Sequence, residues 1–179
     1  MPTLALICHP SSPCPAVRGI AVDVRPGYGG QLALRYRLAA RPDDLRLPPA
    51  GAPAAADNLW QTSCLEAFIA SPDGSDYREF NFSPSRQWAA YRFTDYRQRD
   101  EHFLPPGPPH IELDCRAEEI ILDATIGPEL LPDSTVLIIG LCAVVEAADG
   151  SKSYWALRHG AAQPDFHLRP SFTLTLNRA

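Results

Sequence analysis

Hydrogen-bonding side chains alternate with aromatic ones in the segment 77–83, YREFNFS. Successive side chains of a strand point to opposite faces, so Glu79 and Asn81 share one face and Phe80 and Phe82 the other. The two phenylalanines are predicted to lie in the core. Carboxylate and amide groups can take the hydroxyls of a polyol or sugar in bidentate hydrogen bonds. The face that carries Glu79 and Asn81 is therefore a candidate ligand-binding surface.

The segments before and after this one repeat the pattern. Trp60 and Glu66 have the same parity in LWQTSCLEAFIA, and Trp88 and Arg92 have the same parity in RQWAAYRF. Flat aromatic rings stack on the apolar faces of sugars, so these four residues are predicted to join the binding face. The alternative is a solvated sheet face with cross-strand Glu–Arg pairs, each worth only a few tenths of a kcal/mol.

A second group of candidates lies near the C-terminus, in SYWALRHGAAQPDFHLRPSF. Polar and aromatic groups concentrated on a loop indicate function more strongly than the same groups in a core. Trp155, His159 and His167 are therefore added to the predicted ligand-binding residues. His159, Asp165 and His167 could also hold a metal, but their spacing matches no recognised metal motif, so no metal site is predicted.

The elements that must position these residues are strands. QLALRYRL alternates cleanly, Asp73-Gly74 is a strong hairpin signal, and STVLIIGLCAVVEA is apolar on both faces, as a central strand should be. Helical periodicity is absent. The predicted fold is an all-β antiparallel β-sandwich of about ten strands, forming one domain over residues 1–179. The long connection 39–58 could lie across the binding face, and 98–109 is also long.

Composition excludes several classes of protein. The net charge of −5 and the pI of about 5.5 argue against a nucleic-acid partner, and only one of the sixteen basic residues is Lys. No apolar run approaches the ~20 residues of a membrane span, and the N-terminus does not read as a signal peptide, so a cytoplasmic protein is expected. The five cysteines fit neither a zinc motif nor a disulfide framework.

The segments LWQTSCLEAFIA, YREFNFSPSRQWAAYRFTDYR and DGSKSYWALRHGAAQPDFHLRPSF resemble a bacterial DOMON-like group related to the family 9 carbohydrate-binding modules. The resemblance covers about a third of the chain. It implies a jelly-roll-like or immunoglobulin-like sandwich whose sheet face binds a sugar or a haem. The residues of matching type on matching strands are Trp60, Glu66, Glu79, Asn81, Trp88 and Arg92.

The same resemblance argues against haem. Haem-binding relatives hold iron with an internal Met and a His or Lys, and this sequence has no methionine after Met1. Ligation by His159 and His167 remains formally open, but the resemblance gives it little support. No cofactor is therefore predicted.

The leading prediction is a non-catalytic module that binds a carbohydrate or another small polar ligand. A glycoside-acting enzyme using Glu66 and Glu79 is an alternative. One of the two carboxyls would then need a raised pKa, whereas the surrounding arginines are expected to lower it. A structural or protein-interaction domain, with the face covered, is the other alternative.

Overall fold

The computed structural model describes residues 3–178, and this part of the chain is built of strands joined by loops and short 3-10 helices. The strands are β1 (Thr3–Cys8), β2 (Gly19–Pro26), β3 (Leu32–Ala39), β4 (Ala54–Ala55), β5 (Cys64–Ala70), β6 (Tyr77–Phe82), β7 (Gln87–Asp95), β8 (Gln98–Arg99), β9 (His110–Cys115), β10 (Ile120–Ile126), β11 (Val136–Glu146), β12 (Lys152–Ala156) and β13 (Leu174–Asn177). The 3-10 helices are η1 (Tyr28–Gly30), η2 (Pro42–Asp44), η3 (Leu59–Gln61), η4 (Pro128–Leu130) and η5 (Arg169–Ser171). None of the helices among residues 3–178 has the length and apolar character to cross a membrane.

The strands form one continuous hydrogen-bonded sheet. Its order is β4-β7-β6-β5-β11-β12-β1-β2-β3-β10-β9, with β13 added to β11 and β8 added to β7. The pairing is antiparallel apart from the short parallel pair β4–β7. The expected all-β fold is confirmed.

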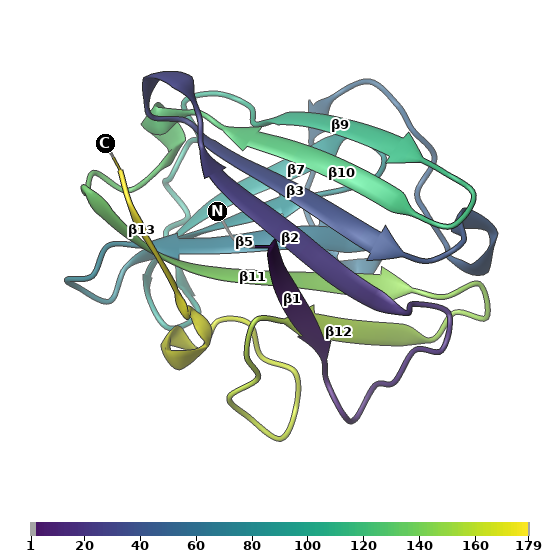
Figure 1. Cartoon of the computed structure of the whole chain (residues 1–179). Helices are drawn as coiled ribbons and strands as arrows, with labels where there is room; N and C mark the ends of the chain where they lie inside the picture. Colours follow the sequence, from purple (N-terminus) through teal and green to yellow (C-terminus); the bar gives the residue numbers. More distant parts are fainter. Residues whose placement is uncertain (1–2, 179) are drawn as a thin grey trace.

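The sheet curls because β1 belongs to both of its halves. Residues 3–6 of β1 pair with β2, and Ile7 and Cys8 pair with β12. In Figure 1 the half made of β2, β3, β10 and β9 lies in front of the half that contains β7, β5 and β11. The predicted β-sandwich is thus not confirmed as such, since a shared strand joins the two layers at one side.

The main core fills the space between the two halves. Leu34 and Tyr36 enter it from β3, and Phe80 and Phe82 enter it from β6. The sequence prediction for both phenylalanines is confirmed, because each is fully buried. The Tyr36 hydroxyl crosses the core and donates a 2.8 Å hydrogen bond to the backbone carbonyl of Glu66 on β5.

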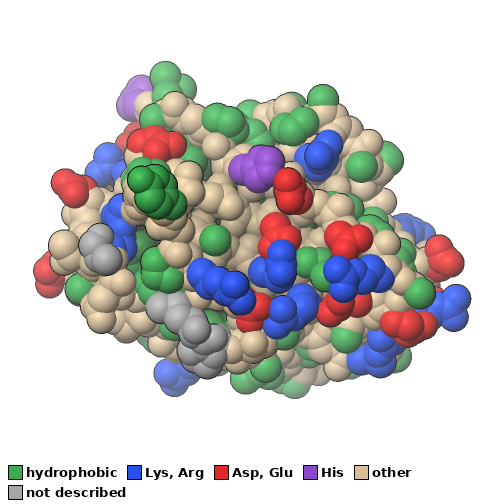
Figure 2. Space-filling view, turned by 45° about the horizontal axis from the view of Figure 1, so that its top comes forward, with side chains coloured by type: hydrophobic (Ala, Val, Ile, Leu, Met, Phe, Trp, Pro, Cys, Tyr) green, Lys and Arg blue, Asp and Glu red, His purple; other side chains and the backbone are tan. Residues whose placement is uncertain are grey.

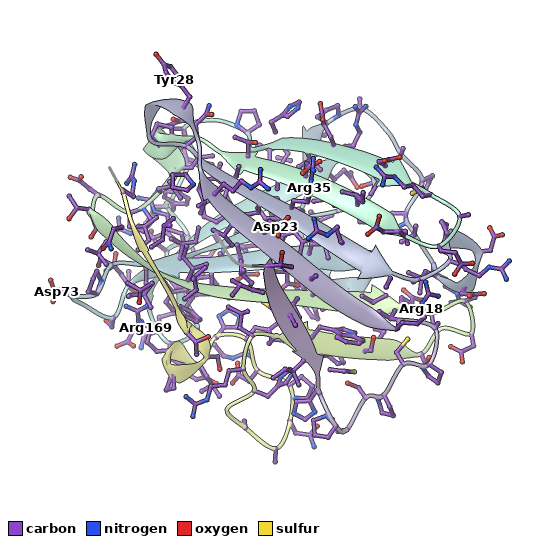
Figure 3. All side chains as sticks on the ribbon, viewed as in Figure 1. Arg18, Asp23, Tyr28, Arg35, Asp73 and Arg169 are labelled. Carbon is purple, nitrogen blue, oxygen red and sulfur yellow. The ribbon has the colours of Figure 1, made fainter. Side chains whose placement is uncertain are left out.

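The outer face of the front half is charged and solvated. Arg35 makes two hydrogen bonds to Asp123, at 2.7 and 2.9 Å, and Arg37 binds Asp23 at 2.7 and 3.2 Å. Figure 3 labels Asp23 and Arg35 on this face, and Figure 2 shows acidic and basic side chains interspersed over this part of the surface. This half of the sheet therefore presents a solvated face with cross-strand Arg–Asp pairs.

The outer face of the back half is aromatic. Phe68, Tyr77, Phe93 and Phe172 form a second buried cluster there, separate from the main core. Phe172, which follows η5, lies over the backbone of Gly140 in β11. The C-terminal segment thus crosses this face before it joins the sheet as β13.

The long connection 39–58 runs along the sheet rather than across this aromatic face. Leu45 forms an isolated bridge with Ala147, and Ala54 and Ala55 pair with Gln87 and Trp88 at the edge of β7. The connection ends close to the aromatic face without covering it, and the candidate site described next opens there.

Candidate functional site

A pocket of about 790 Å³ opens on the aromatic outer face. It extends over β7, β6, β5, β11 and β12, which are consecutive in the sheet. Its volume is within the roughly 300–1,000 Å³ of small-molecule sites. The lining residues are Ser11, Ser12, Asn58, Trp60, Glu66, Phe68, Glu79, Tyr91, Phe93, Arg97, Arg99, Val144, Lys152, Tyr154, Gln163, Pro164, Phe166 and His167.

Two glutamates form the polar part of the pocket floor. Glu66 pairs with Asn81 and Glu79 pairs with Phe68 across the β5–β6 ladder, so the two carboxyl groups are diagonal neighbours on one face. Glu66 is 2% exposed and Glu79 is 6% exposed. The Glu66 Oε2 accepts a long contact of 3.9 Å from the Cys142 thiol, and its Oε1 has no hydrogen-bond partner in the structure.

Asn81 lies beside Glu79 on the same face of β6. It is fully buried and does not line the pocket. Its Nδ2 donates a 2.7 Å hydrogen bond to Glu79 Oε1, and its Oδ1 accepts a contact of 3.5 Å from the Cys64 thiol. We infer that Asn81 orients Glu79 rather than contacting a ligand directly.

Burial raises the pKa of both glutamates, because a carboxylate loses its hydration in this floor. The pKa of Glu66 is well above its ordinary value, through burial and then through the charge of Glu79. Burial raises the pKa of Glu79 to about 7, against the opposing effects of the Asn81 hydrogen bond and of Arg97 and Arg99. Arg97 and Arg99 lower the pKa of Glu79 as expected, but the net shift of both carboxyls is upward, since burial has the larger effect.

His167 is enclosed by three aromatic rings. Its ring centroid lies 5.1 Å from that of Phe68, 5.9 Å from Tyr77 and 5.0 Å from Phe93. Burial lowers the pKa of His167 to about 4, and the charge of Arg97 acts in the same direction. The imidazole is therefore neutral at pH 7.

The hydrogen bonds around Tyr77 assign the His167 tautomer. The Tyr77 hydroxyl accepts a 3.1 Å hydrogen bond from the Arg97 backbone N–H and lies 2.8 Å from His167 Nδ1. Its own proton is free to be donated to Nδ1, which leaves the imidazole proton on Nε2. That Nε2 lies 3.8 Å from Glu79 Oε2. The floor thus presents a neutral N–H donor beside two carboxyl groups.

Aromatic side chains and cations form the walls. Trp60 is 50% exposed at the rim, on η3. Tyr91 donates a 2.7 Å hydrogen bond to Asp57, and the Arg99 guanidinium lies 4.1 Å from the centre of its ring. On the opposite side, Tyr154 lies 6.3 Å from Phe166 between ring centroids.

The structure places Trp88 and Arg92 away from this pocket, contrary to the prediction. Trp88 pairs with Phe82 and Arg92 pairs with Arg78, so both belong to the face of β7 opposite to that of Glu79. Trp88 packs against the main core, and Arg92 is exposed at 3.9 Å from Asp76. The sequence reasoning chose the wrong row of β7 because Trp88 was taken as a ligand-stacking ring.

Trp155 and His159 also lie outside the pocket. Trp155 is 6% exposed in the main core, where its indole N–H donates to Ser153 Oγ at 2.9 Å. His159 Nε2 lies 2.8 Å from the Ile7 carbonyl, and its ring meets the edge of His9 at 4.7 Å. Of the four tryptophan and histidine candidates other than Trp88, only Trp60 and His167 line the pocket.

Sequence reasoning missed most of the walls. Tyr91 and Phe93 share the face of Glu79, because Glu79 pairs directly with Tyr91. Their alternation with Trp88 and Arg92 was visible in the sequence and needed only the correct register. Tyr154 and Phe166 lie in the C-terminal segment singled out from the sequence but were not chosen as site residues, and Ser11, Ser12, Arg97, Arg99, Lys152 and Gln163 also line the pocket.

Metal ligands are not gathered in this region. Across residues 3–178, no group of three or more His, Cys, Asp or Glu side chains is arranged to hold a metal ion. Asp165, the third residue weighed as a ligand with His159 and His167, accepts hydrogen bonds from Tyr96 at 2.6 Å and Arg97 at 2.9 Å.

Comparison with known proteins gives structural relatives. The sequence matches no protein-family model and none of the curated proteins. The fold is similar to that of a candidate carbohydrate-binding protein from Bacteroides uniformis, with a TM-score of 0.71 and 14% identity over 99% of this chain and 86% of that chain. It is also similar to a family 9 carbohydrate-binding module from Caldicellulosiruptor kristjanssonii in complex with glucose, with a TM-score of 0.53 and 10% identity over 89% of this chain and 75% of that chain. At these identities the similarity establishes the fold alone.

Proposed function

We propose that this protein is a carbohydrate-binding module of the DOMON-like type that binds a saccharide in the pocket over β5, β6 and β7. The observation that carries the proposal is a pocket with hydrogen-bonding groups on its floor and aromatic rings around its rim. Glu66 Oε1 is buried without a partner and would accept a ligand hydroxyl or donate to one when protonated. Trp60 and Tyr154 supply flat apolar surface for a sugar ring.

Two further observations support this proposal. The solved structures with a similar fold are a candidate carbohydrate-binding protein and a module in complex with glucose. The connection 39–58 pairs with the edge of β7 and leaves the pocket open, which disfavours an interaction domain whose face is covered by its own loop.

Isothermal titration calorimetry against a panel of neutral mono- and disaccharides tests the proposal. Trp60→Ala should weaken binding at least tenfold, since it removes the exposed ring at the rim. Glu79→Gln should weaken it as well, by changing the hydrogen-bonding pattern of the floor. Tyr28→Ala is the matched control, because Tyr28 is 98% exposed and lies outside this pocket.

The result that would overturn the proposal is a folded protein that binds none of the saccharides. Binding that survives both pocket substitutions unchanged would equally reject this pocket as the site. Fluorescence gives an independent reading. Trp88 and Trp155 pack against the main core, so any ligand-dependent change should disappear with Trp60.

A glycoside-acting enzyme is a second candidate, favoured by the raised pKa of both glutamates. Glycosidases use two carboxyls of different protonation flanking the scissile bond. The pKa of Glu66, raised well above its ordinary value by burial, and the pKa of about 7 of Glu79 favour such a pair near neutral pH. Turnover of nitrophenyl glycosides that disappears in Glu66→Gln would establish this activity.

A further inference from the structure

The pocket is rich in cations although the protein is acidic. The net charge of the sequence is −5, yet Arg97, Arg99 and Lys152 all line this one pocket. Lys152 is the only lysine among 179 residues. A cationic pocket on an acidic protein concentrates anionic ligands locally.

The two arginines have acidic neighbours within the protein. Arg97 forms an ion pair with Asp165 at 2.9 Å. Arg99 is stacked on Tyr91 and lies 3.8 Å from Asp57 and 3.7 Å from Glu101. The charge of both arginines is therefore partly compensated before any ligand arrives.

Lys152 differs from them. Its ammonium donates a 2.6 Å hydrogen bond to the backbone carbonyl of Gln61, and it forms no ion pair among the residues that the structure describes. Its cross-strand neighbour, Glu146, forms its ion pair with Arg46 at 3.2 Å instead. Lys152 thus presents an uncompensated positive charge at the rim. The carbonyl that it binds belongs to Gln61, which follows Trp60 in the chain.

The pocket floor does not supply the missing negative charge. Burial raises the pKa of Glu66 well above its ordinary value and that of Glu79 to about 7, so the charged form of both carboxyls is disfavoured. Glu66 also keeps its unpartnered Oε1. The floor is suited to neutral hydroxyl groups and the Lys152 rim to an anion.

Register gives the separation of these two ends. On β11, Glu66 pairs with Cys142 and Lys152 pairs with Glu146. Two interstrand spacings and four residues of rise place the two Cα atoms roughly 16 Å apart. This span between the two backbone positions is longer than a single sugar ring. Two linked units fit better.

We propose that the ligand is an acidic oligosaccharide of at least two units, with its inner unit on Glu66 and Glu79 and its anionic outer unit on Lys152 beside Trp60. The anionic group can be a carboxylate or a phosphate. This inference rests on the proposed function, since it specifies the class of saccharide that the same pocket takes.

Matched ligand pairs test the inference by calorimetry. We would compare cellobiose with cellobiouronic acid, and galabiose with the disaccharide of galacturonic acid linked to galactose, and use cellobiose phosphate to separate phosphate from carboxylate. The acidic member of the preferred pair should bind about five- to tenfold tighter at low salt, as expected for a partly exposed ion pair. The advantage should shrink as sodium chloride screens the charge. Glucuronic acid alone should show little of it.

Variants locate the effect. Lys152→Gln should abolish the preference for the acid, so that the acidic and neutral partners bind alike, and Lys152→Arg should retain most of the preference. Arg25→Gln is the matched control, because Arg25 is exposed on β2 and removing it changes the net charge by the same amount.

The outcomes separate the inference from the proposed function. Equal binding of acidic and neutral partners overturns the inference and leaves the carbohydrate-binding function standing. A preference for the acid that survives Lys152→Gln overturns the placement of the anion. Failure of every saccharide, neutral and acidic, rejects the proposed function itself.

Discussion

The Glu79 carboxyl and the His167 imidazole lie 3.8 Å apart where burial disfavours the charge of each. The groups that face them are Glu66 on β5, Tyr77 on β6, and Arg97 and Arg99 beyond β7. In an exposed pair, a histidine and a glutamate each favour the charged form of the other, which raises the pKa of the histidine and lowers that of the glutamate. Here the shifts indicate that a neutral pair is preferred between about pH 4 and 7.

The titrations of Glu79 and His167 should change the unfolding free energy in opposite directions as pH rises. The raised pKa of Glu79 means that its contribution is fully present below about pH 4.5 and is lost as pH rises through about 7. The lowered pKa of His167 means that its contribution is present above about pH 6.5 and is lost as pH falls through about 4. The unfolding free energy of Glu79→Gln minus that of the wild type should therefore increase by about 3 kcal/mol as pH rises from 4.5 to 7.

Urea unfolding at several pH values measures this pH dependence of the unfolding free energy. His167→Gln is the second variant, and it tests the opposite direction. Its free energy relative to the wild type should change with the opposite slope, rising by about 3 kcal/mol as pH falls from 7 to 4. Parallel slopes for the two variants would show that burial does not control these two groups.

At the scale of elements, the aromatic face depends on how closely η5 and the residue after it approach β11. A Cβ atom on Gly140 would lie 2.7 Å from Cδ1 of Phe172, a distance that packed atoms do not adopt. Phe172 in turn contacts Phe68 at 5.7 Å between ring centroids, and so helps to hold the pocket floor. Gly140 therefore allows the C-terminal segment to seat on the sheet.

Gly140→Ala should destabilise the protein by about 1–3 kcal/mol in urea unfolding, the usual cost of an overpacked site. Gly19→Ala is the control, since a Cβ there meets no atom within 4 Å. It should have little effect or be slightly stabilising. The cost of Gly140→Ala should also fall in a Phe172→Leu background, and an unchanged cost there would show that the clash is not the cause.

The strands were largely predictable from sequence, because alternation and turn chemistry are local signals. Leu32, Leu34, Tyr36 and Leu38 alternate in β3 and are all buried. The Asp73-Gly74 turn joins β5 and β6 as expected. Trp60 was expected to extend β5, but it lies on η3, since the strand begins at Cys64.

The site was predictable only in part, for a physical reason. Glu66 and Glu79 lie on one face because of strand periodicity, which the sequence shows. Which face of β7 lies beside them depends on the register of the β6–β7 hairpin. Choosing Trp88 as a ligand-stacking ring selected the opposite face. The loop carrying His167 is held by long-range contacts such as Tyr96 to Asp165, which leave no local pattern.

At the scale of the whole molecule, the curled sheet shares one core between its halves. Tyr36 on β3 hydrogen-bonds the Glu66 carbonyl on β5 across that core. The pocket floor on one side of β5 and the main core on the other are thus linked through a single strand. We expect the two halves to unfold together, because the main core lies between them and both contribute to it.

Tyr36→Phe should lower the unfolding free energy by about 1–2 kcal/mol, since a buried carbonyl loses its donor. Unfolding should remain a single transition in which tryptophan fluorescence and far-UV circular dichroism coincide. Tyr28→Phe, at a 98% exposed position, should change nothing measurable. Two separated transitions in the wild type would show that the halves are independent units.

The single lysine has a practical consequence for studying this protein. Its ammonium lies at the mouth of the pocket, so any reagent that couples to lysine side chains reacts at the place where a ligand would enter. Immobilising the protein through Lys152 would turn the pocket toward the matrix and obstruct it. Attachment through Cys115, exposed on β9 in the opposite half of the sheet, would leave the pocket facing the solution.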